Sequence, residues 1–295
     1  MSDTPPTRKR LPRARRVSED ARPPMVLTER DRAIVATVNA YKALLGKQLE
    51  RRFFSSRSTA QYRLQRLYQH EFLDRHFMPV VTTAPAASPM IYTLGKRGAY
   101  LLTRELGYAP AQLRRFPKAI KWQFMEHLLA INEVRAAISL ACRDHGFTLE
   151  EWLDEPVFRG APEYVQVTDG KGKTSDKPVF PDGYFRIKTP QGTAHCFLEV
   201  DRATEQQSKF RPQVEVYEAY VASGQYQARF SPKSMRVLIV TTTTERMLNL
   251  KKTVEAAGGD AKYWFTTLAQ VTEATVLTAP IWERLGSRTK RAWLA

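Results

Sequence analysis

The stretch VFPDGYFRIKTPQGTAHCFLEVD, residues 179–201, decides the fold of the larger part of this chain. It holds two predicted strands, residues 179–188 and 195–201. Three carboxylates lie on them: Asp182 in the first strand, and Glu199 and Asp201 in the second. Because residues two apart on a strand point to the same side, Glu199 and Asp201 share one face of the sheet. If the strands are neighbours, Asp182 joins them at one end of the sheet.

These three acids predict a metal site. Carboxylates that converge repel one another unless a counterion lies between them. Mg²⁺, for which Mn²⁺ can substitute, takes oxygen ligands and keeps waters, so it can activate a water and stabilise charge on a phosphodiester. The predicted metal ligands are therefore Asp182, Glu199 and Asp201. The alternative is that Arg202, Arg186 or backbone donors near the strand ends neutralise these acids.

The segments on either side predict one mixed sheet. Helices are predicted over residues 127–144, 212–222 and 245–257, and further strands over residues 148–152, 237–240 and 263–266. The order α-β-β-β-α-β-α-β indicates an α/β or α+β domain. Residues 169–173 are expected to form the tip of a long hairpin or insertion between the first two strands.

Basic residues are concentrated in the front of the chain. Residues 1–120 hold 23 basic and 9 acidic side chains, whereas residues 121–295 hold 23 basic and 21 acidic ones. The formal net charge of +16 therefore belongs almost entirely to the first two fifths of the chain. This asymmetry indicates a front half that binds a polyanion and a back half of ordinary charge.

The front half predicts a winged helix-turn-helix. Three helical segments, which begin near Thr28, Ala43 and Ser58, are followed by extended segments at residues 72–80 and 90–93. In a winged helix the third helix enters the major groove of DNA. That helix has a capping-box pattern at Ser58 and Gln61. Its apolar stripe is Ala60, Leu64, Leu67 and Tyr68.

The opposite face of the third helix carries groups that can donate hydrogen bonds to phosphate oxygens and base edges. Basic residues also open the next helix, which begins at residues 95–98. The alternative is a charged helix face that is only solvated. The predicted DNA-binding residues are Arg57, Thr59, Tyr62, Arg63, Arg66, Gln69, Lys96 and Arg97.

Five segments follow from these patterns. Residues 1–25 are a basic tail rich in proline, either disordered or an arm that tracks phosphates or a groove. The predicted boundaries after the tail are 26–106 for the winged helix, 107–122 for a basic linker, 123–280 for the sheet domain and 281–295 for a C-terminal tail.

Several classes of protein are excluded by composition. A hydrophobic content of 43% supports real cores, and no apolar run is long enough to span a membrane. The N-terminus lacks the apolar region of a signal peptide. Cys142 and Cys196 have no CxxC partner, so neither a disulfide framework nor a zinc site is expected. A cytoplasmic location follows.

The chain resembles the replication-relaxation family of plasmids and other mobile elements. The matching pieces are LTERDRAIVATV with the winged helix after it, YTLGKRGAYLL, HLLAINEVRAAI, PDGYF and FLEVDRATEQQSKFRPQVEVYEAY. The PD acid and the E-x-D on the next strand, in an αβββαβ order, look like the PD-(D/E)xK nuclease fold of restriction endonucleases. The resemblance implies a winged helix fused to a nuclease-like domain that acts in plasmid replication, relaxation or transfer.

The resemblance also assigns roles to single residues. Asp182 is the PD acid, Glu199 is the acid of the third strand, and Glu133 matches a helix glutamate of such nucleases. The departure is Asp201, where the family of nucleases has lysine to position or activate the water. Lys209, just before the next helix, is the candidate substitute, and Lys188 is a weaker one.

Two functions remain open at this point. One is a DNA-binding protein whose sheet domain nicks DNA with Mg²⁺, without a covalent intermediate. The other is a non-catalytic replication initiator or transcriptional regulator whose degenerate nuclease-like domain serves dimerisation or partner binding. The expected partners are double-stranded DNA and, beyond it, a second copy of the chain or other replication or transfer proteins, with no membrane.

Overall fold

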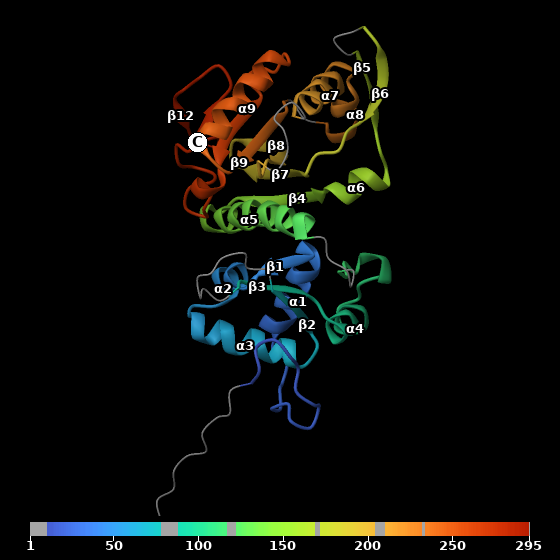
Figure 1. Ribbon diagram of the computed structural model, residues 1–295, viewed down its shortest axis with the longest axis vertical. Coiled ribbons are helices and arrows are strands. Elements are labelled where there is room, and N and C mark those ends of the chain that lie inside the picture. Colours follow the sequence, from blue (N-terminus) through green and yellow to red (C-terminus); the bar gives the residue numbers. More distant parts are fainter. Residues whose placement is uncertain are drawn as a thin grey trace, which may run out of the picture. The chain divides into compact units, whose positions relative to one another are not determined.

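A computed structural model describes residues 11–77, 88–116, 122–168, 172–203, 210–231 and 234–294 (Figure 1). The chain combines helices with a mixed sheet, as the sequence predicts for an α+β protein. It divides into two compact units, Met1–Asn132 and Glu133–Ala295. The division lies inside a helix, whereas the sequence placed a linker at residues 107–122. None of the helices in the described ranges is long and apolar enough to cross a membrane.

Apart from the short strand β1, the N-terminal unit has the predicted order of three helices, two strands and a further helix. Its elements are α1 (Glu29–Tyr41), β1 (Ala43–Leu45), α2 (Gly46–Phe53), α3 (Arg57–Gln69), β2 (Leu73–Phe77), β3 (Met90–Leu94), α4 (Lys96–Arg104) and the 3-10 turn Pro110–Gln112. The three strands form an antiparallel sheet in the order β1-β3-β2. Residues 78–87, which join β2 to β3, lie outside the described residues.

Strand β1 is the difference from the sequence prediction, which began a helix at Ala43. Ala43 and Leu44 are buried and pair with Thr93 and Tyr92 of β3, so tertiary pairing overrides their helical tendency. Helix α2 then begins at Gly46. The sheet therefore has a third strand, which a run of three apolar residues is too short to predict.

The core of the N-terminal unit lies between α1, α3 and the sheet. Ile34, Val35 and Val38 of α1 are fully buried, and the predicted apolar stripe of α3 is buried as well. Helix α4 packs very closely on the chain before β2. A Cβ added at Gly98 would lie only 2.2 Å from the Phe72 carbonyl oxygen. Only glycine allows that approach.

The first part of α5 (Trp122–His145) completes this unit. Met125 and Leu129 pack on Ala43 and Ile91. Asn132 is buried and its Nδ2 donates to the carbonyl oxygens of Tyr41, at 2.9 Å, and Ala43, at 2.7 Å. These bonds tie α5 to the backbone at the end of α1 and the start of β1.

The C-terminal unit is built on a seven-stranded sheet in the order β12-β11-β10-β9-β8-β7-β4. Strands β8, β9 and β10 are mutually parallel, and the other neighbours are antiparallel. The main elements are β4 (Thr148–Asp154), β7 (Gly183–Thr189), β8 (Gly192–Val200), α7 (Phe210–Ala222), β9 (Arg236–Thr241), α9 (Thr244–Ala256) and β10 (Tyr263–Thr267). This is the predicted α-β-β-β-α-β-α-β order.

Several shorter elements also belong to this unit, and most of them were not predicted from the sequence. They are α6 (Glu155–Gly160), β5 (Tyr164–Thr168), β6 (Thr174–Pro178), α8 (Gln225–Phe230), the 3-10 turn Leu268–Gln270, β11 (Trp282–Arg284) and β12 (Lys290–Arg291). The hairpin β5-β6 is the insertion expected around residues 169–173, of which 169–171 lie outside the described part. Residues 281–295, expected to be a tail, contribute both β11 and β12.

The core of the C-terminal unit lies between the sheet and its helices. Helices α7 and α9 cover one face of the sheet, and the C-terminal part of α5 runs along the other (Figure 1). The α7 and α9 side centres on Phe197, whose ring contacts Tyr217, Tyr220 and Tyr226. The thiols of Cys142 and Cys196 are free, and burial raises the pKa of each to about 12.

Candidate nucleic-acid interface and carboxylate site

The N-terminal half of α3 is exposed. The N-cap of the helix is Ser56, two residues before Ser58 of the predicted capping box, and its Oγ accepts a hydrogen bond from the Thr59 backbone. The apolar stripe of the helix is buried as predicted. Exposed side chains in the first two turns are Arg57, Ser58, Thr59, Gln61 and Tyr62. This half of the helix is available to a partner.

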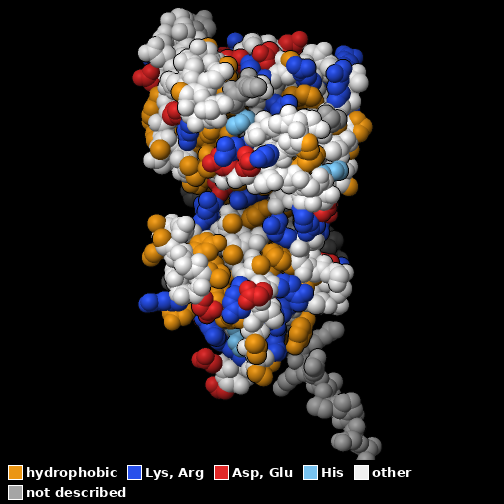
Figure 2. Space-filling model, turned by 180° about the vertical axis from the view of Figure 1, so that it is seen from behind, with side chains coloured by type: hydrophobic (Ala, Val, Ile, Leu, Met, Phe, Trp, Pro, Cys, Tyr) orange, Lys and Arg blue, Asp and Glu red, His pale blue; other side chains and the backbone are white. Residues whose placement is uncertain are grey.

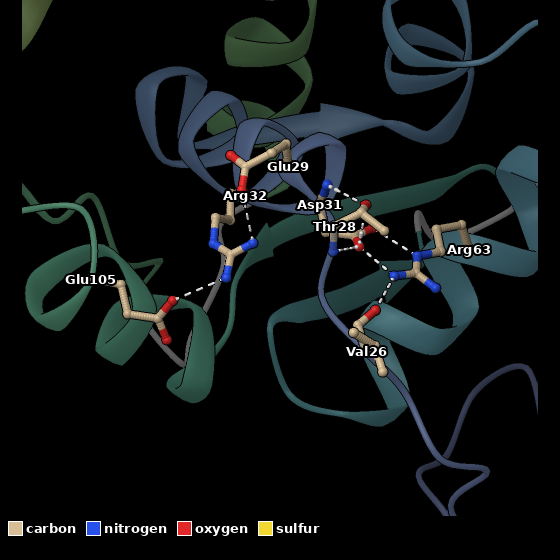
Figure 3. A network of polar contacts seen from close by, with 7 residues as sticks. All are labelled: Val26, Thr28, Glu29, Asp31, Arg32, Arg63 and Glu105. Atoms are coloured by element: carbon tan, nitrogen blue, oxygen red, sulfur yellow. Dashed lines mark hydrogen bonds and ion pairs between the residues drawn. The ribbon is translucent and has the colours of Figure 1, made fainter.

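Arg63, one of the predicted DNA-binding residues, makes contacts within the chain itself. Its Nε donates to Asp31 Oδ1 at 2.7 Å, and its Nη2 donates to Asp31 Oδ2 and to the Val26 carbonyl oxygen (Figure 3). Asp31 is fully buried and also accepts from the backbone and hydroxyl of Thr28, the N-cap of α1. Arg63 therefore joins α3 to α1, and its guanidinium is engaged inside the protein.

The charge of Asp31 is stabilised by these donors. Burial by itself raises the pKa of Asp31, but the hydrogen bonds from Arg63 and Thr28 outweigh burial and hold that pKa below its usual value. The carboxylate is therefore ionised in the folded unit, and the ion pair with Arg63 is a structural contact.

Gln69 and Arg66 also bind the chain itself. Gln69 is fully buried: its Oε1 accepts from the Val17 backbone at 2.9 Å, and its Nε2 donates to the Arg15 carbonyl oxygen at 3.0 Å. Arg66 Nη2 donates to the Pro24 carbonyl oxygen, and its guanidinium lies 5.3 Å from the centre of the Tyr62 ring. Residues 11–25, for which disorder was one expectation, are thus docked on the C-terminal half of α3.

Basic side chains gather at this C-terminal end of α3. Lys96 and Arg97 are exposed at the start of α4, and the Arg97 guanidinium lies 4.9 Å from the Phe72 ring centre. Burial lowers the pKa of His70, and the nearby charges of Arg97, Arg66 and Arg22 lower it further. Figure 2 shows one face of this unit, on which Lys and Arg side chains are numerous.

Two of the three predicted carboxylates come together in the C-terminal unit. Asp182 lies directly before β7, and its Oδ2 accepts from the Val200 backbone at 2.7 Å. Glu199 on β8 is buried and its Oε1 accepts from the hydroxyl of Tyr217 and from Gln213 Nε2, at 3.4 Å. Burial raises the pKa of Glu199 well above its usual value, and the charge of Asp182 raises it further.

Asp201, the third predicted ligand, is held in an ion pair. Arg246 in the first turn of α9 donates from Nε and Nη2 to the two carboxylate oxygens, each at 2.9 Å. The Thr241 hydroxyl donates to Oδ2 at 2.7 Å. Burial opposes ionisation, but these bonds prevail and lower the pKa of Asp201. The alternative of a neutralised acid applies to Asp201, with Arg246 as the partner; Arg186 pairs with Glu151 instead.

The donor set does not fit Mg²⁺ as these side chains are arranged. Asp201 offers both oxygens to a guanidinium, and one Glu199 oxygen accepts from a tyrosine. Over the described ranges, His, Cys, Asp and Glu side chains form no group of three that could hold a metal ion, so Glu133 on α5 does not complete one. Lys209 lies outside the described residues. Lys188 pairs with Thr193, at the opposite end of β7 from Asp182.

The sequence analysis did not identify the residues that bind these acids. Gln213 and Tyr217 are one turn apart on α7, and Gln213 Nε2 donates to the Tyr217 hydroxyl at 2.8 Å. Their spacing of four was visible as one helix face, and Arg246 was visible three residues after the N-cap Thr243. Nothing in the local sequence indicates which acid each of them meets.

A protein-family model described as replication-relaxation matches residues 36–232, more than half of the chain. No curated protein and no solved structure matches the chain. The matched range includes most of the N-terminal unit and, in the C-terminal unit, Asp182 and Glu199. It associates the chain with the replication or relaxation of mobile DNA. The chain belongs to the replication-relaxation family.

Proposed function

We propose that the N-terminal unit binds double-stranded DNA through the exposed first two turns of α3. The observation that carries this proposal is the division of α3 into two halves. Its first half presents Arg57, Thr59 and Tyr62 to solvent, while Arg63 behind them fixes the helix on α1. The winged-helix order of the unit supports it, because the third helix of that fold enters the major groove with its N-terminal residues near the bases.

The chemistry of this half suits DNA. Arg57 and Thr59 donate hydrogen bonds to phosphates or base edges, and Tyr62 adds a hydroxyl and an aromatic face. The helix N-terminus also favours a phosphate, because unpaired backbone N–H groups and the helix dipole point toward it. Arg66 and Arg97 add positive charge farther along. The family associates the chain with mobile DNA, so this binding serves its replication or relaxation.

Removing the two exposed groups is expected to weaken DNA binding. The double variant Arg57→Ala and Tyr62→Ala should lose affinity by roughly tenfold or more, because contacts to phosphates or bases contribute about 1–3 kcal/mol each. Fluorescence anisotropy with a labelled duplex measures this. Tyr164→Ala is the matched control, since Tyr164 is 53% exposed against 49% for Tyr62 and lies in the other unit. Equal affinity of both variants would refute the assignment of α3.

We propose further that the C-terminal unit is a nuclease-like scaffold that does not cleave DNA. Its αβββαβ order supports the nuclease-like origin, and the pairing of Asp201 with Arg246 supports the loss of cleavage. Asp182 and Glu199 then act as structural acids that hold β7, β8 and α7 together through Val200 and Tyr217. Dimerisation or contact with other replication proteins stays a prediction for this unit.

The test is cleavage of supercoiled plasmid with Mg²⁺ or Mn²⁺. Wild type is expected to nick no more than Asp182→Ala or Glu199→Ala, while all three bind a duplex equally well. Metal-dependent nicking that both variants lose, with DNA binding intact, would instead make the protein an endonuclease whose lysine has moved. The binding measurement guards against a variant that has simply unfolded.

A further inference from the structure

Residues 11–26, which we call the strap, are built onto the C-terminal half of α3. Buried Gln69 holds the backbone of the strap at three points, at Pro12, Arg15 and Val17. Further bonds run from Gln65 Nε2 to the Leu11 carbonyl oxygen at 2.7 Å, from the Tyr68 hydroxyl to the Ala14 carbonyl oxygen at 3.2 Å, and between His70 Nε2 and the Pro23 carbonyl oxygen at 2.9 Å. A segment held at so many points has one defined position.

The arginines of the strap fall into two pairs. Arg16 and Arg22 are anchors: Arg16 Nη2 lies 2.5 Å from Asp74 Oδ1, and Arg22 Nη2 lies 3.0 Å from Glu71 Oε1. These pairs neutralise two acids directly after α3 that would repel a phosphate. The side chains of Arg13 and Arg15 are exposed instead. Docking therefore neutralises Glu71 and Asp74 and places Arg13 and Arg15 on the surface, while the strap's own acids, Glu19 and Asp20, are exposed at the turn before Arg22.

Arg13 lies at the base of the β2-β3 hairpin. Its Nη2 donates to the Ser88 carbonyl oxygen at 2.8 Å, and its guanidinium lies 5.4 Å from the Phe77 ring centre. Phe77 ends β2 and Ser88 stands two residues before β3, so Arg13 contacts the chain at the end of one strand and near the start of the other. The strap thus runs from the polar face of α3 to the hairpin, the two elements with which a winged helix meets DNA.

We infer that the strap is a fixed part of the DNA-binding surface, in which Arg13 and Arg15 contact phosphates and base contacts are confined to the first two turns of α3. This inference rests on the proposed DNA binding. An inhibitory segment that mimics DNA would place acids on α3. The strap instead offers backbone carbonyls to Gln65, Arg66 and Gln69 and directs its free charge outward. Arg66 and Gln69, which the sequence predicts to contact DNA, therefore hold the strap in position.

The test measures the affinity of the full chain for a labelled duplex of mixed sequence over a range of NaCl concentrations. For Arg13→Ala with Arg15→Ala we expect binding to weaken roughly tenfold or more at about 0.1 M salt, and the salt slope to become shallower by about 1.8, since each phosphate contact contributes about 0.9. The matched control is Arg288→Ala with Arg291→Ala, two exposed arginines of the other unit. Hydrogen exchange should show the strap still docked in both.

A second variant separates positioning from inhibition. Gln69→Leu removes the three bonds to the strap, so strap peptides should exchange faster and affinity should fall. Tighter binding by Gln69→Leu would show that the strap blocks α3, and a strap double variant that behaves as its control would remove the strap from the interface. Loss of binding in the Arg57 and Tyr62 variant alone would keep the proposed function and reject only this inference. Absence of DNA binding by wild type would reject both.

Discussion

Asp31→Ala is expected to lower the free energy of unfolding of the N-terminal unit by about 3–5 kcal/mol, the usual cost of removing one partner of a buried ion pair. Asp31 is 0% exposed and its partner Arg63 retains 16% of its side-chain exposure, so the guanidinium is left poorly solvated. The variant also removes the capping box with Thr28, which satisfies the first turn of α1. Loss of this contact frees α3 from α1, so DNA binding is expected to fall as well.

Hydrogen exchange in urea, followed on peptides of α1 and α3, measures this loss. A unit-specific probe is needed because four of the five tryptophans lie in the C-terminal unit. Glu29→Ala is the matched control: its side chain is 92% exposed and its pair with Arg32 should contribute about 0.5 kcal/mol or less. If Asp31→Ala were no less stable than this control, Arg63 would be free to reach DNA, as the sequence predicts.

The same variant has a defined dependence on pH. Because the pKa of Asp31 is lower in the folded unit, its contribution to stability is complete above the ordinary value of 3.8 and is lost as the pH falls through the folded-state pKa. The stability difference between wild type and Asp31→Ala should therefore be constant near neutral pH and shrink in acid. A difference that persisted unchanged in acid would mean that Asp31 does not act as a carboxylate.

The long elements of this fold could be predicted because each carries a periodic pattern. Helix α5 and the apolar strand β9 were placed correctly from hydrophobic spacing alone. Strand β1 was not, because three apolar residues before a helix look like the start of that helix. Strand β11 is as short as β1 and β12 is shorter, and pairing along the edge of a sheet is a long-range property that no local window contains.

The polar side chains were harder to assign, for a physical reason. A helix face shows which residues leave the core, but it does not show which of them the chain itself will use. Tyr62 and Gln69 both lie on the predicted polar face of α3, yet Tyr62 is half exposed and Gln69 is fully buried under the strap. The partners of Gln69 are backbone groups of Pro12, Arg15 and Val17, and backbone groups have no sequence signature.

The carboxylates illustrate the same limit at the candidate metal site. The sequence predicts that Asp182 joins Glu199 if their strands are neighbours; β7 and β8 do pair, and burial together with the charge of Asp182 raises the pKa of Glu199. Register also predicted that Asp201 would join them, because it lies two residues after Glu199. Asp201 instead follows the end of β8 and bonds to Arg246, which comes from a helix 45 residues later. The two-residue repeat of a strand determines which face a side chain points to only within that strand. Asp201 lies beyond the end of β8, so the repeat does not determine where its side chain points.

Asp201→Lys is expected to lower the free energy of unfolding of the C-terminal unit by about 3 kcal/mol or more, because it breaks the ion pair and sets a second cation against Arg246. Both side chains are largely buried, with exposures of 11% for Asp201 and 16% for Arg246, so water screens their repulsion poorly. Urea unfolding followed by tryptophan fluorescence measures the loss in this unit. The charge-exchanged pair, Asp201→Lys with Arg246→Glu, should recover most of it, and the double-mutant cycle isolates the pair itself.

This substitution also separates two explanations of the missing nuclease lysine. If an acid has merely replaced a catalytic lysine in an otherwise intact site, Asp201→Lys should fold well and nick plasmid in the presence of Mg²⁺. If Asp201 and Arg246 form a structural pair, the single variant should be unstable, and the charge-exchanged variant should be stable without nicking. We expect the second outcome, because Arg246 already places a fixed positive charge beside position 201. A lysine there would meet a cation rather than a water to activate.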